Sequence, residues 1–515
     1  MDLIFLILCT LCIIVIFAIL SLVYEQYVTR QKFKNFPQID EGSFIIGSTF
    51  ELIKQSPYER TKWMISCMEK TRKEGIFVQW FGTMPIVWMF KPEYLEHILH
   101  STVNITKGDD YDLLKPWLGN GLLTSTGQQW FHDRKLIGPT FHFTILDQFA
   151  VTQFEKAEIL LKCIEKKREK NPEKPIDACP LLTNVALDII CETAMGVDIH
   201  AQENETEYTL ALQEMSDLTL DRFFTPWYWI DWLYFSLPVG KKLKSKIDIL
   251  HKFTTEVINK KRAERQSQSD YTEVKNVDDD IDIGTVRRRE KQFLDLLLDQ
   301  NKETDTPFTD DELRSQVDTL MFAGHDTTSY AMTWVLFLLG NNFEQQEKVH
   351  KELKEVFGDS DTPINAKDLS KLKYLDRVIK ETLRIFPSAA IISRKLVEDV
   401  KLDKYTLAKD TTVILPILMT HRNPEIWPDP LKFDPDRFLP ENSKDRNPYA
   451  YVPFSAGPRN CVGQKFALQE QKIILTTILR KYKVKSVKTI DMVKYVASVV
   501  LRPDEEILIH FTPKK

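Results

Sequence analysis

The sequence predicts a mainly α-helical protein with small β-sheets, preceded by one N-terminal transmembrane helix. This prediction depends on an uncharged apolar run at residues 3–23, on amphipathic helical periodicity through most of the remaining chain, and on a few short strand-like segments. The chain has 515 residues, of which 43% are hydrophobic, and 69 basic side chains stand against 74 acidic ones. This composition excludes a disordered chain and a multi-span membrane protein. The slightly acidic balance argues against nucleic acid as the main partner.

Residues 3–23 are expected to form the membrane anchor. They contain no charged side chain, and a helix of this length spans the ~30 Å hydrocarbon core of a bilayer. Arg30, Lys32 and Lys34 follow the run, so the positive-inside rule predicts that the bulk of the chain lies on the cytoplasmic side. A cleaved signal peptide is the alternative, although Asp2 and the length of the apolar run fit that pattern poorly.

After the anchor, residues 24–45 are expected to form a linker. Short strands are expected at Phe77–Phe81, Pro85–Phe90 and Thr411–Leu415, because these segments are rich in aromatic and β-branched residues. Amphipathic helices are expected to dominate the rest of the chain.

Two segments have an unusual composition. Residues 266–290 are polar and carry blocks of acidic and then basic side chains, so we expect a solvated loop. Residues 223–235 are dense in aromatic side chains. They predict either buried core or a surface that touches the bilayer near the anchor, because aromatic rings favour the headgroup level.

One long helix is especially well marked. Thr309 and Glu312 form a capping box, and the helical pattern then runs to Gly340, a length of about 45 Å that would cross a large domain. Its middle reads Ala-Gly-His-Asp-Thr-Thr at residues 323–328. Glycine and threonine are weak helix formers, and a buried acid beside an alcohol is costly unless it is used.

The strongest functional signal is the segment 454–463, which reads FSAGPRNCVG. Its pattern FxxGxRxCxG has five fixed positions, which match by chance roughly once in three million windows. Gly457 and Gly463 would let the backbone turn tightly and approach a flat partner closely. Cys461 would lie where a helix begins, where backbone N–H groups stabilise a thiolate that can bind a metal. Arg459 would supply a cation for an anionic group of the ligand.

This segment resembles the haem-binding loop of the cytochromes P450, in which the cysteine thiolate is the axial iron ligand. Three further segments match family motifs in the expected order: Trp130–Arg134 (WxxxR), Glu381–Arg384 (ExxR) and Pro435–Phe438 (PxRF). The resemblance covers residues 35–515. It implies one mainly α-helical cytochrome P450 domain with small β-sheets, residues 46–515, where the length alone would suggest two or three domains.

The resemblance implies how haem b is held. Cys461 would be the iron ligand, and Trp130, Arg134, Arg394 and Arg459 would contact the haem propionates, since the arginine fork matches a carboxylate. No second metal is implied.

The resemblance also assigns roles to residues away from the cysteine loop. Asp326 and Thr327 match the oxygen-activating motif, in which they would organise water and relay protons while the thiolate promotes cleavage of the O–O bond. Glu381, Arg384 and Arg437 would form a buried charge network that fixes the fold around the cysteine loop.

The sequence of residues 316–328 resembles that of family four of this superfamily, and the sequence as a whole resembles arthropod members. Family four implies ω-hydroxylation of fatty acids and related chains, and arthropod members imply insect hormones or insecticides as substrates. The pocket is expected over the haem, between residues 112–123, residues 389–392 and the middle of the long helix at Phe322. Many family-four members carry a glutamate that is esterified to the haem where this chain has Ala323, so we expect non-covalent haem.

The partners follow from what the chain lacks. It contains no flavin or nicotinamide motif, so electrons are expected from NADPH through the membrane-bound NADPH–cytochrome P450 reductase, with Lys135 and Lys465 as candidate contacts. Cytochrome b5 is a further candidate partner. The expected location is the endoplasmic reticulum (microsomal) membrane, with a single pass, a cytosolic catalytic domain and a small lipophilic substrate.

The main alternative is a haem-thiolate isomerase, dehydratase or gas sensor that does not activate dioxygen. Such proteins commonly lack the acid–alcohol pair, so Asp326 and Thr327 argue against it. His97 and His100 have the spacing of zinc ligands, but no HExxH or paired CxxC accompanies them, and the absence of GxxxxGK[ST] excludes a P-loop nucleotide hydrolase.

Overall fold

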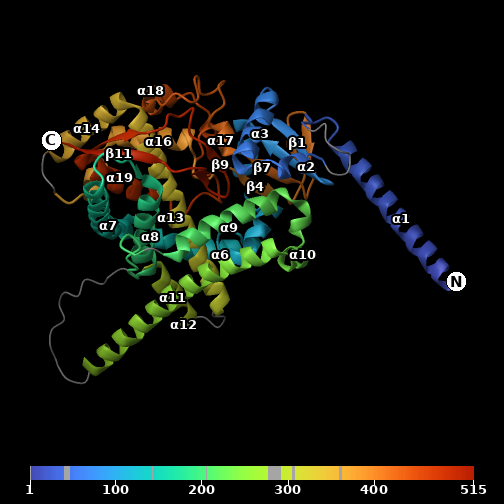
Figure 1. Cartoon of the computed structure of the whole chain (residues 1–515), viewed down its shortest axis with the longest axis horizontal. Coiled ribbons are helices and arrows are strands. Elements are labelled where there is room, and N and C mark those ends of the chain that lie inside the picture. The colour runs from blue at the N-terminus through green and yellow to red at the C-terminus, as the bar shows by residue number, and fades with distance from the viewer. Residues whose placement is uncertain are drawn as a thin grey trace.

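The computed structural model describes residues 2–39, 47–141, 143–204, 206–275, 292–303, 308–358 and 362–514. Within these residues a mainly helical domain carries four small β-sheets, and the N-terminal helix projects from it (Figure 1). The α-helices are α1 (Asp2–Lys32), α2 (Thr49–Ile53), α3 (Pro57–Lys70), α4 (Pro92–Leu99), α5 (Lys115–Leu118), α6 (Gly127–Ile137), α7 (Phe143–Lys170), α8 (Ala178–Ile190), α9 (Glu207–Phe224), α10 (Asp231–Ser236), α11 (Pro238–Lys275), α12 (Phe293–Glu303), α13 (Asp310–Asn341), α14 (Phe343–Phe357), α15 (Ala366–Leu369), α16 (Lys373–Ile385), α17 (Ile417–Thr420), α18 (Pro440–Ser443) and α19 (Gln464–Lys481). The β-strands are β1 (Ile76–Phe81), β2 (Met84–Met89), β3 (Ile176–Asp177), β4 (Ile392–Lys395), β5 (Val400–Leu402), β6 (Tyr405–Leu407), β7 (Thr412–Leu415), β8 (Tyr482–Ser486), β9 (Tyr495–Ala497), β10 (Leu501–Pro503) and β11 (Leu508–Pro513). Short helical turns near the site are η1 (Asp109–Leu114), η4 (Pro226–Trp229) and η5 (Pro435–Phe438).

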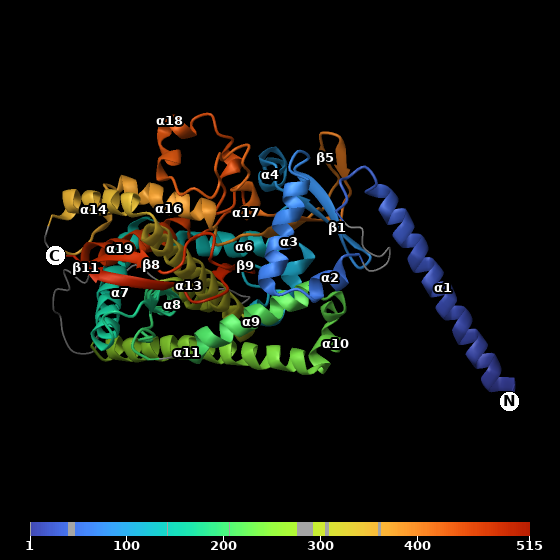
Figure 2. The same cartoon turned by 45° about the horizontal axis from the view of Figure 1, so that its top comes forward.

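Helix α1 stands clear of the domain in both views (Figures 1 and 2). Its segment Ile4–Lys32 is long and apolar enough to cross a membrane, and none of its most apolar stretch is buried against the protein. The helix continues past the predicted end of the anchor at residue 23, because no proline or glycine interrupts residues 24–32. The first part of the expected linker is therefore helical. The segment Ala178–Met195 passes the same test, but 72% of it is buried in the domain core.

All three predicted strands are confirmed as β1, β2 and β7. They form one sheet with β4 in the order β1-β2-β7-β4, in which only the β2–β7 pair is parallel. Side chains alternate across the sheet, so Val78 and Trp80 of β1 pack in a small apolar cluster while Phe77 and Phe81 face the main core. The remaining strands form the sheets β3-β11-β8, β9-β10 and β5-β6.

Helix α13 is the central element, with α8, α11, α16 and α19 packed around it. It begins as predicted, because the Glu312 N–H donates to the Thr309 hydroxyl at 3.2 Å and the Thr309 N–H donates to the Glu312 carboxylate at 2.8 Å. A Cβ atom at Gly324 would come within 2.5 Å of the Ile190 side chain, so the glycine allows α8 to pack closely against α13. The weak segment in its middle therefore serves a close helix contact.

The structure agrees only in part with the predictions for the two segments of unusual composition, residues 266–290 and 223–235. Residues 266–275 continue helix α11, so the predicted loop is wrong there, because no glycine or proline stops the helix. Residues 276–290 lie outside the described residues. In the aromatic segment, Phe224 and Tyr234 are buried in the core, as the first alternative predicts, whereas Trp232 is 76% exposed.

The predicted buried charge network is confirmed. Two nitrogens of Arg384 each lie 2.8 Å from a carboxylate oxygen of Glu381, and both side chains are inaccessible to solvent. Arg437 joins the same carboxylate at 3.4 Å. Nearby, Tyr451 donates to the carbonyl of Lys380 at 3.0 Å, which ties the start of the cysteine loop to α16. The network also reaches the residues before this loop, because Arg384 donates to the carbonyl of His421 at 3.0 Å and the Val452 N–H donates to the His421 ring at 2.8 Å.

Candidate active site

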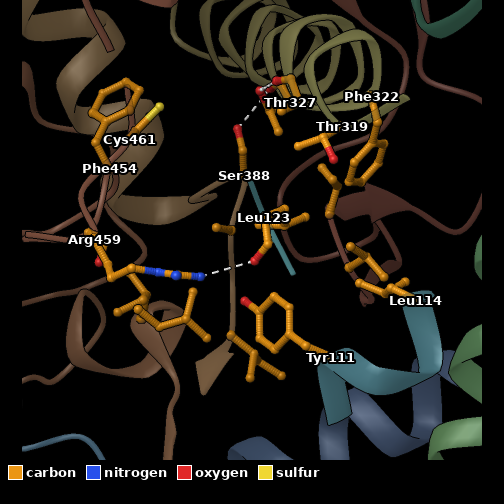
Figure 3. A pocket seen from close by; sticks show the side chains of 18 of the residues that line it. Tyr111, Leu114, Leu123, Thr319, Phe322, Thr327, Ser388, Phe454, Arg459 and Cys461 are labelled. Atoms are coloured by element: carbon orange, nitrogen blue, oxygen red, sulfur yellow. Dashed lines mark hydrogen bonds between the residues drawn. The ribbon is translucent and has the colours of Figure 1, made fainter. Parts of the chain in front are cut away.

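A cavity of about 360 Å³ lies between the middle of α13 and the cysteine loop (Figure 3). Apolar side chains form most of its wall, among them Leu113, Leu114, Leu122, Leu123, Ile190, Leu220, Phe223, Phe224, Phe322, Ile391, Val499 and Val500. The predicted segments 112–123 and 389–392 therefore do contribute to the wall. The residues of α9 and the turn at 497–500 were missed by sequence reasoning, although the aromatic segment that begins at Phe223 was a partial signal.

The cysteine loop places the Cys461 sulfur on this cavity (Figure 3). The Cys461 N–H donates to the carbonyl of Phe454 at 2.9 Å, and α19 begins three residues later. Ser455 and Gly457 both have positive φ, of 59° and 66°, and a Cβ at Gly457 would lie 1.8 Å from the carbonyl oxygen of Leu99. The tight turn expected at Gly457 is therefore confirmed.

Gly463 also lies in a turn, as expected, but the conformation of this turn does not require a glycine. Its φ is −91°, which any residue can adopt, and a Cβ there would meet only the Phe141 ring at 3.9 Å. Gly463 lines the cavity instead, so a small residue here leaves room beside the Cys461 sulfur.

Burial raises the pKa of the Cys461 thiol, while the Gly463 N–H and the charge of Arg134 act in the opposite direction. The sulfur is open to the cavity. The backbone at the start of α19 therefore favours a thiolate, as expected, while desolvation acts against it. A metal ion bound to the sulfur would supply the missing positive charge.

Three of the predicted haem contacts meet at one edge of the cavity. Arg134 holds the cysteine loop through Asn460, with bonds of 3.0 Å to its carbonyl and 2.7 Å to its side-chain oxygen. The Arg459 guanidinium lies 4.7 Å from the centre of the Trp130 ring and donates to the carbonyl of Leu123 at 3.2 Å. The protein thus holds both arginines through neutral acceptors and leaves their charge uncompensated there.

Arg394 is buried and lies behind this edge, outside the residues that line the cavity. It nevertheless acts on the site, because after burial its charge is the main cause that lowers the pKa of Arg459 to about 9. Sequence reasoning missed a fourth cation, Lys107, which lines the cavity with its ammonium 4.1 Å from the centre of the Tyr111 ring. Burial, Arg394 and Arg459 hold the pKa of Lys107 well below its usual value.

No sequence signal identifies Lys107, because its segment reaches the site through hydrogen bonds to β4, which is distant in the sequence. The Lys395 N–H donates to the carbonyl of Thr106 at 3.0 Å, and the Ser393 hydroxyl donates to the carboxylate of Asp110. These bonds hold residues 106–110 beside Arg394.

The donor set fits the haem that the sequence motif implies. Four cations crowd one edge of the cavity, and Asp110 is the carboxylate that lines it among the described residues. A surplus of buried positive charge is costly unless an anionic group neutralises it. A flat iron complex with two carboxylates would meet both the cations and the Cys461 sulfur.

Of the predicted pair Asp326 and Thr327 on α13, only Thr327 lines the cavity. Thr327 lines it, and its hydroxyl donates to the carbonyl of Ala323 at 2.8 Å, as expected for threonine in a helix (Figure 3). Asp326 is buried outside the lining residues, and burial raises the pKa of its carboxyl to about 7. The structure therefore does not bring both groups to the cavity surface.

Comparison with known proteins identifies the family. Residues 37–511 match the protein family described as Cytochrome P450. Cytochrome P450 4V2 of Mus musculus is 42% identical over 93% of this chain and 90% of the relative. Cytochrome P450 4c3 of Drosophila melanogaster is 42% identical over 85% of this chain and 82% of the relative, and cytochrome P450 4c21 of Blattella germanica is 39% identical over 89% of both. These names confirm the resemblance to family four, with relatives in mammals as well as insects. The chain therefore belongs to the cytochrome P450 family and is a haem-thiolate monooxygenase of the oxidoreductase class.

Proposed function

We propose that this cytochrome P450 inserts one oxygen atom from O2 into C–H bonds of lipophilic substrates with fatty-acid-like chains. The observation that carries this proposal is the apolar wall of the cavity that faces Cys461. An apolar pocket favours ligands that bury hydrocarbon, and each buried CH2 group contributes about 0.8 kcal/mol. Insect hormones and insecticides with long apolar chains fall within the same class of ligand.

Cys461 would hold the haem iron, and the two carboxylates of the haem would meet Lys107, Arg134, Arg394, Arg459 and the Trp130 N–H. Haem, when bound, supplies the activation of dioxygen. Because Ala323 has no carboxylate, the haem would be held only by these contacts and by burial.

Thr327 and Asp326 would supply protons from α13. The Thr327 hydroxyl lies at the cavity, where it can accept a hydrogen bond and pass on a proton. A carboxyl with a pKa of about 7 exchanges protons readily at neutral pH, which suits Asp326 as the source. Because Asp326 does not line the cavity, a water molecule would have to connect the two groups.

Electrons would come from NADPH through the membrane-bound reductase, with cytochrome b5 as a second candidate donor. Lys135 and Lys465 are both exposed; Lys135 follows Arg134 on α6, and Lys465 lies in the first turn of α19, which follows Cys461. Basic side chains there would attract an acidic partner surface, and salt would weaken this attraction.

We further propose that the domain lies against the cytosolic face of the endoplasmic reticulum membrane. Besides α1, an exposed aromatic patch supports this: Phe50 of α2, Trp227 of η4 and Trp232 of α10 are 52%, 42% and 76% exposed. The Phe50 and Trp227 ring centres are 6.2 Å apart. Helices α2 and α10 lie on the side of the domain from which α1 projects (Figures 1 and 2). Aromatic rings at this place would enter the headgroup layer.

Reconstitution tests the proposed function. The full-length protein with reductase and NADPH should convert long-chain lipids to hydroxylated products, and its reduced carbon monoxide complex should show the absorption typical of thiolate ligation. Cys461→Ala should abolish both signals, and the matched control Cys163→Ala should keep them, because Cys163 lies outside the cavity. A haem-thiolate spectrum without any oxygenated product would favour the isomerase or sensor alternative.

A further inference from the structure

We infer that the hydroxyls of Thr319 and Ser498 donate hydrogen bonds to oxygen atoms of the substrate, so that the cavity recognises a lipid by an oxygen-bearing head group as well as by its hydrocarbon. Acids, esters and alcohols share this chemistry. The inference rests on the proposed function, because it deepens the substrate class of the same cavity. It is based on the hydrogen-bond partners of the hydroxyl side chains that line the cavity.

Several hydroxyls in the cavity wall already have a partner in the protein. Thr219 donates to the sulfur of Met215 at 3.4 Å, and Ser388 donates to the carbonyl of Thr327 at 2.9 Å. Thr327 and Thr328 donate to carbonyls of the preceding turn of α13. A hydroxyl has a single hydrogen to donate, so these four side chains have no free donor for a ligand.

Thr319 is the exception on α13. The other serine and threonine side chains of this helix each donate to a backbone carbonyl three or four residues earlier: Ser315, Thr327, Thr328, Ser329 and Thr333. The Thr319 hydroxyl has no partner among the described residues, although its side chain is only 3% exposed and lines the cavity (Figure 3). A Cβ atom at Gly121 would come within 2.2 Å of this oxygen, so the glycine leaves the hydroxyl uncovered on that side.

Ser498 carries the second such hydroxyl, in the turn between β9 and β10. This turn is fixed at both ends, because the Ala497 N–H donates to the Thr61 hydroxyl at 3.1 Å and the Leu501 N–H donates to the Ser388 carbonyl at 2.8 Å. The Ser498 side chain is 6% exposed and lines the cavity, and its hydroxyl has no partner within the described chain. The backbone therefore holds this hydroxyl at the wall without using its donor.

Two further hydroxyls of the wall lie on the haem side. Ser455 belongs to the cysteine loop, and Tyr111 lies at the cation edge, with the Lys107 ammonium 4.1 Å from the centre of its ring. Thr319, in contrast, lies eight residues before Thr327 on α13, which is about 12 Å along the helix axis. A head group bound at Thr319 would leave the hydrocarbon chain free to extend towards Thr327.

An unpartnered buried hydroxyl favours a ligand oxygen because the hydroxyl is costly to leave unpaired. Native proteins contain few buried polar groups without a hydrogen-bond partner. A head-group oxygen that accepts from such a hydroxyl replaces its lost hydration, and the protein breaks no bond of its own. A hydrocarbon of the same length gains nothing from the hydroxyl. One such hydrogen bond strengthens binding about threefold to tenfold.

The test compares methyl dodecanoate with tetradecane, the hydrocarbon with the same number of chain atoms, on the full-length, haem-loaded protein in nanodiscs. Dissociation constants are measured with isotope-labelled ligands and are corrected for the partition into nanodiscs without protein. The ester is the main probe because it has no titratable group. Dodecanoic acid is the second probe and should respond as the ester does, since the same hydroxyls would serve its carboxylate; a response of the ester alone would overturn the shared recognition of acids.

Variants remove the two donors. The double substitution Thr319→Val with Ser498→Ala should weaken binding of the ester at least threefold and leave the dissociation constant of tetradecane unchanged. The matched control Thr219→Val removes a hydroxyl of the same wall whose donor is used within α9, so the ratio of ester to tetradecane affinity should stay unchanged. An unchanged ratio in the double variant would overturn the inference and leave the proposed function standing. If the natural chain bound none of the lipids, both would fall.

Stability separates a binding role of the hydroxyl from a structural one. Thr319→Val keeps the shape of the side chain and removes a donor without a partner, so in the absence of lipid it should not lower the midpoint of urea unfolding. A lower midpoint with an unchanged affinity ratio would show that the hydroxyl only supports the fold. Should the double variant fail to fold, each single variant gives the same comparison, and a single variant that keeps the full ratio removes its residue from the assignment.

Discussion

Replacement of Asp326 by asparagine should make the stability of the domain less sensitive to pH. Burial raises the pKa of this carboxyl from 3.8 to about 7, so the folded chain binds the proton more tightly than the unfolded chain. The stabilisation that results is complete below the unfolded pKa and is lost as pH rises through the folded pKa. About two of the roughly three units between the unfolded and folded pKa lie above pH 5, so a rise from about pH 5 to pH 8 costs the natural chain about 3 kcal/mol of stability, which the asparagine variant would not lose.

The titratable groups near Asp326 do not change charge over this pH range, so they do not mask the pH dependence of stability. Tyr208 and Tyr330 act electrostatically on the same region, but burial holds the pKa of each phenol well above its usual value, so both stay neutral over this range. Asp318, two turns earlier on α13, is an internal check because burial raises its pKa to about 8. Asp318→Asn should give the same behaviour at a pH about one unit higher.

Thermal unfolding of the haem-loaded protein measures the difference in stability between Asp326→Asn and the natural chain. For a domain of this size about 1 kcal/mol corresponds to roughly 1 °C, so the gap in midpoint between Asp326→Asn and the natural chain should grow by about 3 °C from pH 5 to pH 8. Asp311→Asn is the matched control, since that carboxylate is exposed on the same helix. A constant gap across the pH range would refute the argument that burial sets the pKa of Asp326.

Three further predictions follow from the site and its support. Thr327→Ala should keep the haem content but divert electrons from NADPH to hydrogen peroxide, and unchanged coupling of NADPH use to product would contradict its proton role. Glu381→Gln leaves Arg384 buried without a counter-charge and should destabilise the domain by about 3–5 kcal/mol, whereas Glu344→Gln in an exposed pair should cost about 0.5 kcal/mol or less in urea unfolding. Under denaturing acid chromatography the haem should separate fully from the polypeptide, and Ala323→Glu should create a covalently bound fraction; haem that stays with the natural chain would show that another residue forms a link.

The sequence by itself determined the features that depend on short stretches of chain. The capping box at Thr309 is satisfied by residues three positions apart, so it needs no tertiary contact. The spacing in residues 454–463 predicted both the turn at Gly457 and the family, because the iron-binding loop is one continuous segment. The apolar run at residues 3–23 likewise predicted a membrane-length helix, although the helix continues to Lys32.

Only the tertiary structure decided which charges meet. Lys107 joins the cation cluster because its segment pairs along β4, and Arg60 forms an ion pair with Asp221 of α9. The same holds for protonation: the local sequence predicts that the backbone favours a thiolate at Cys461, but only the fold adds the burial that raises the pKa of that thiol. Desolvation and ion pairing depend on atoms that are distant in the sequence, so no local pattern can reveal them.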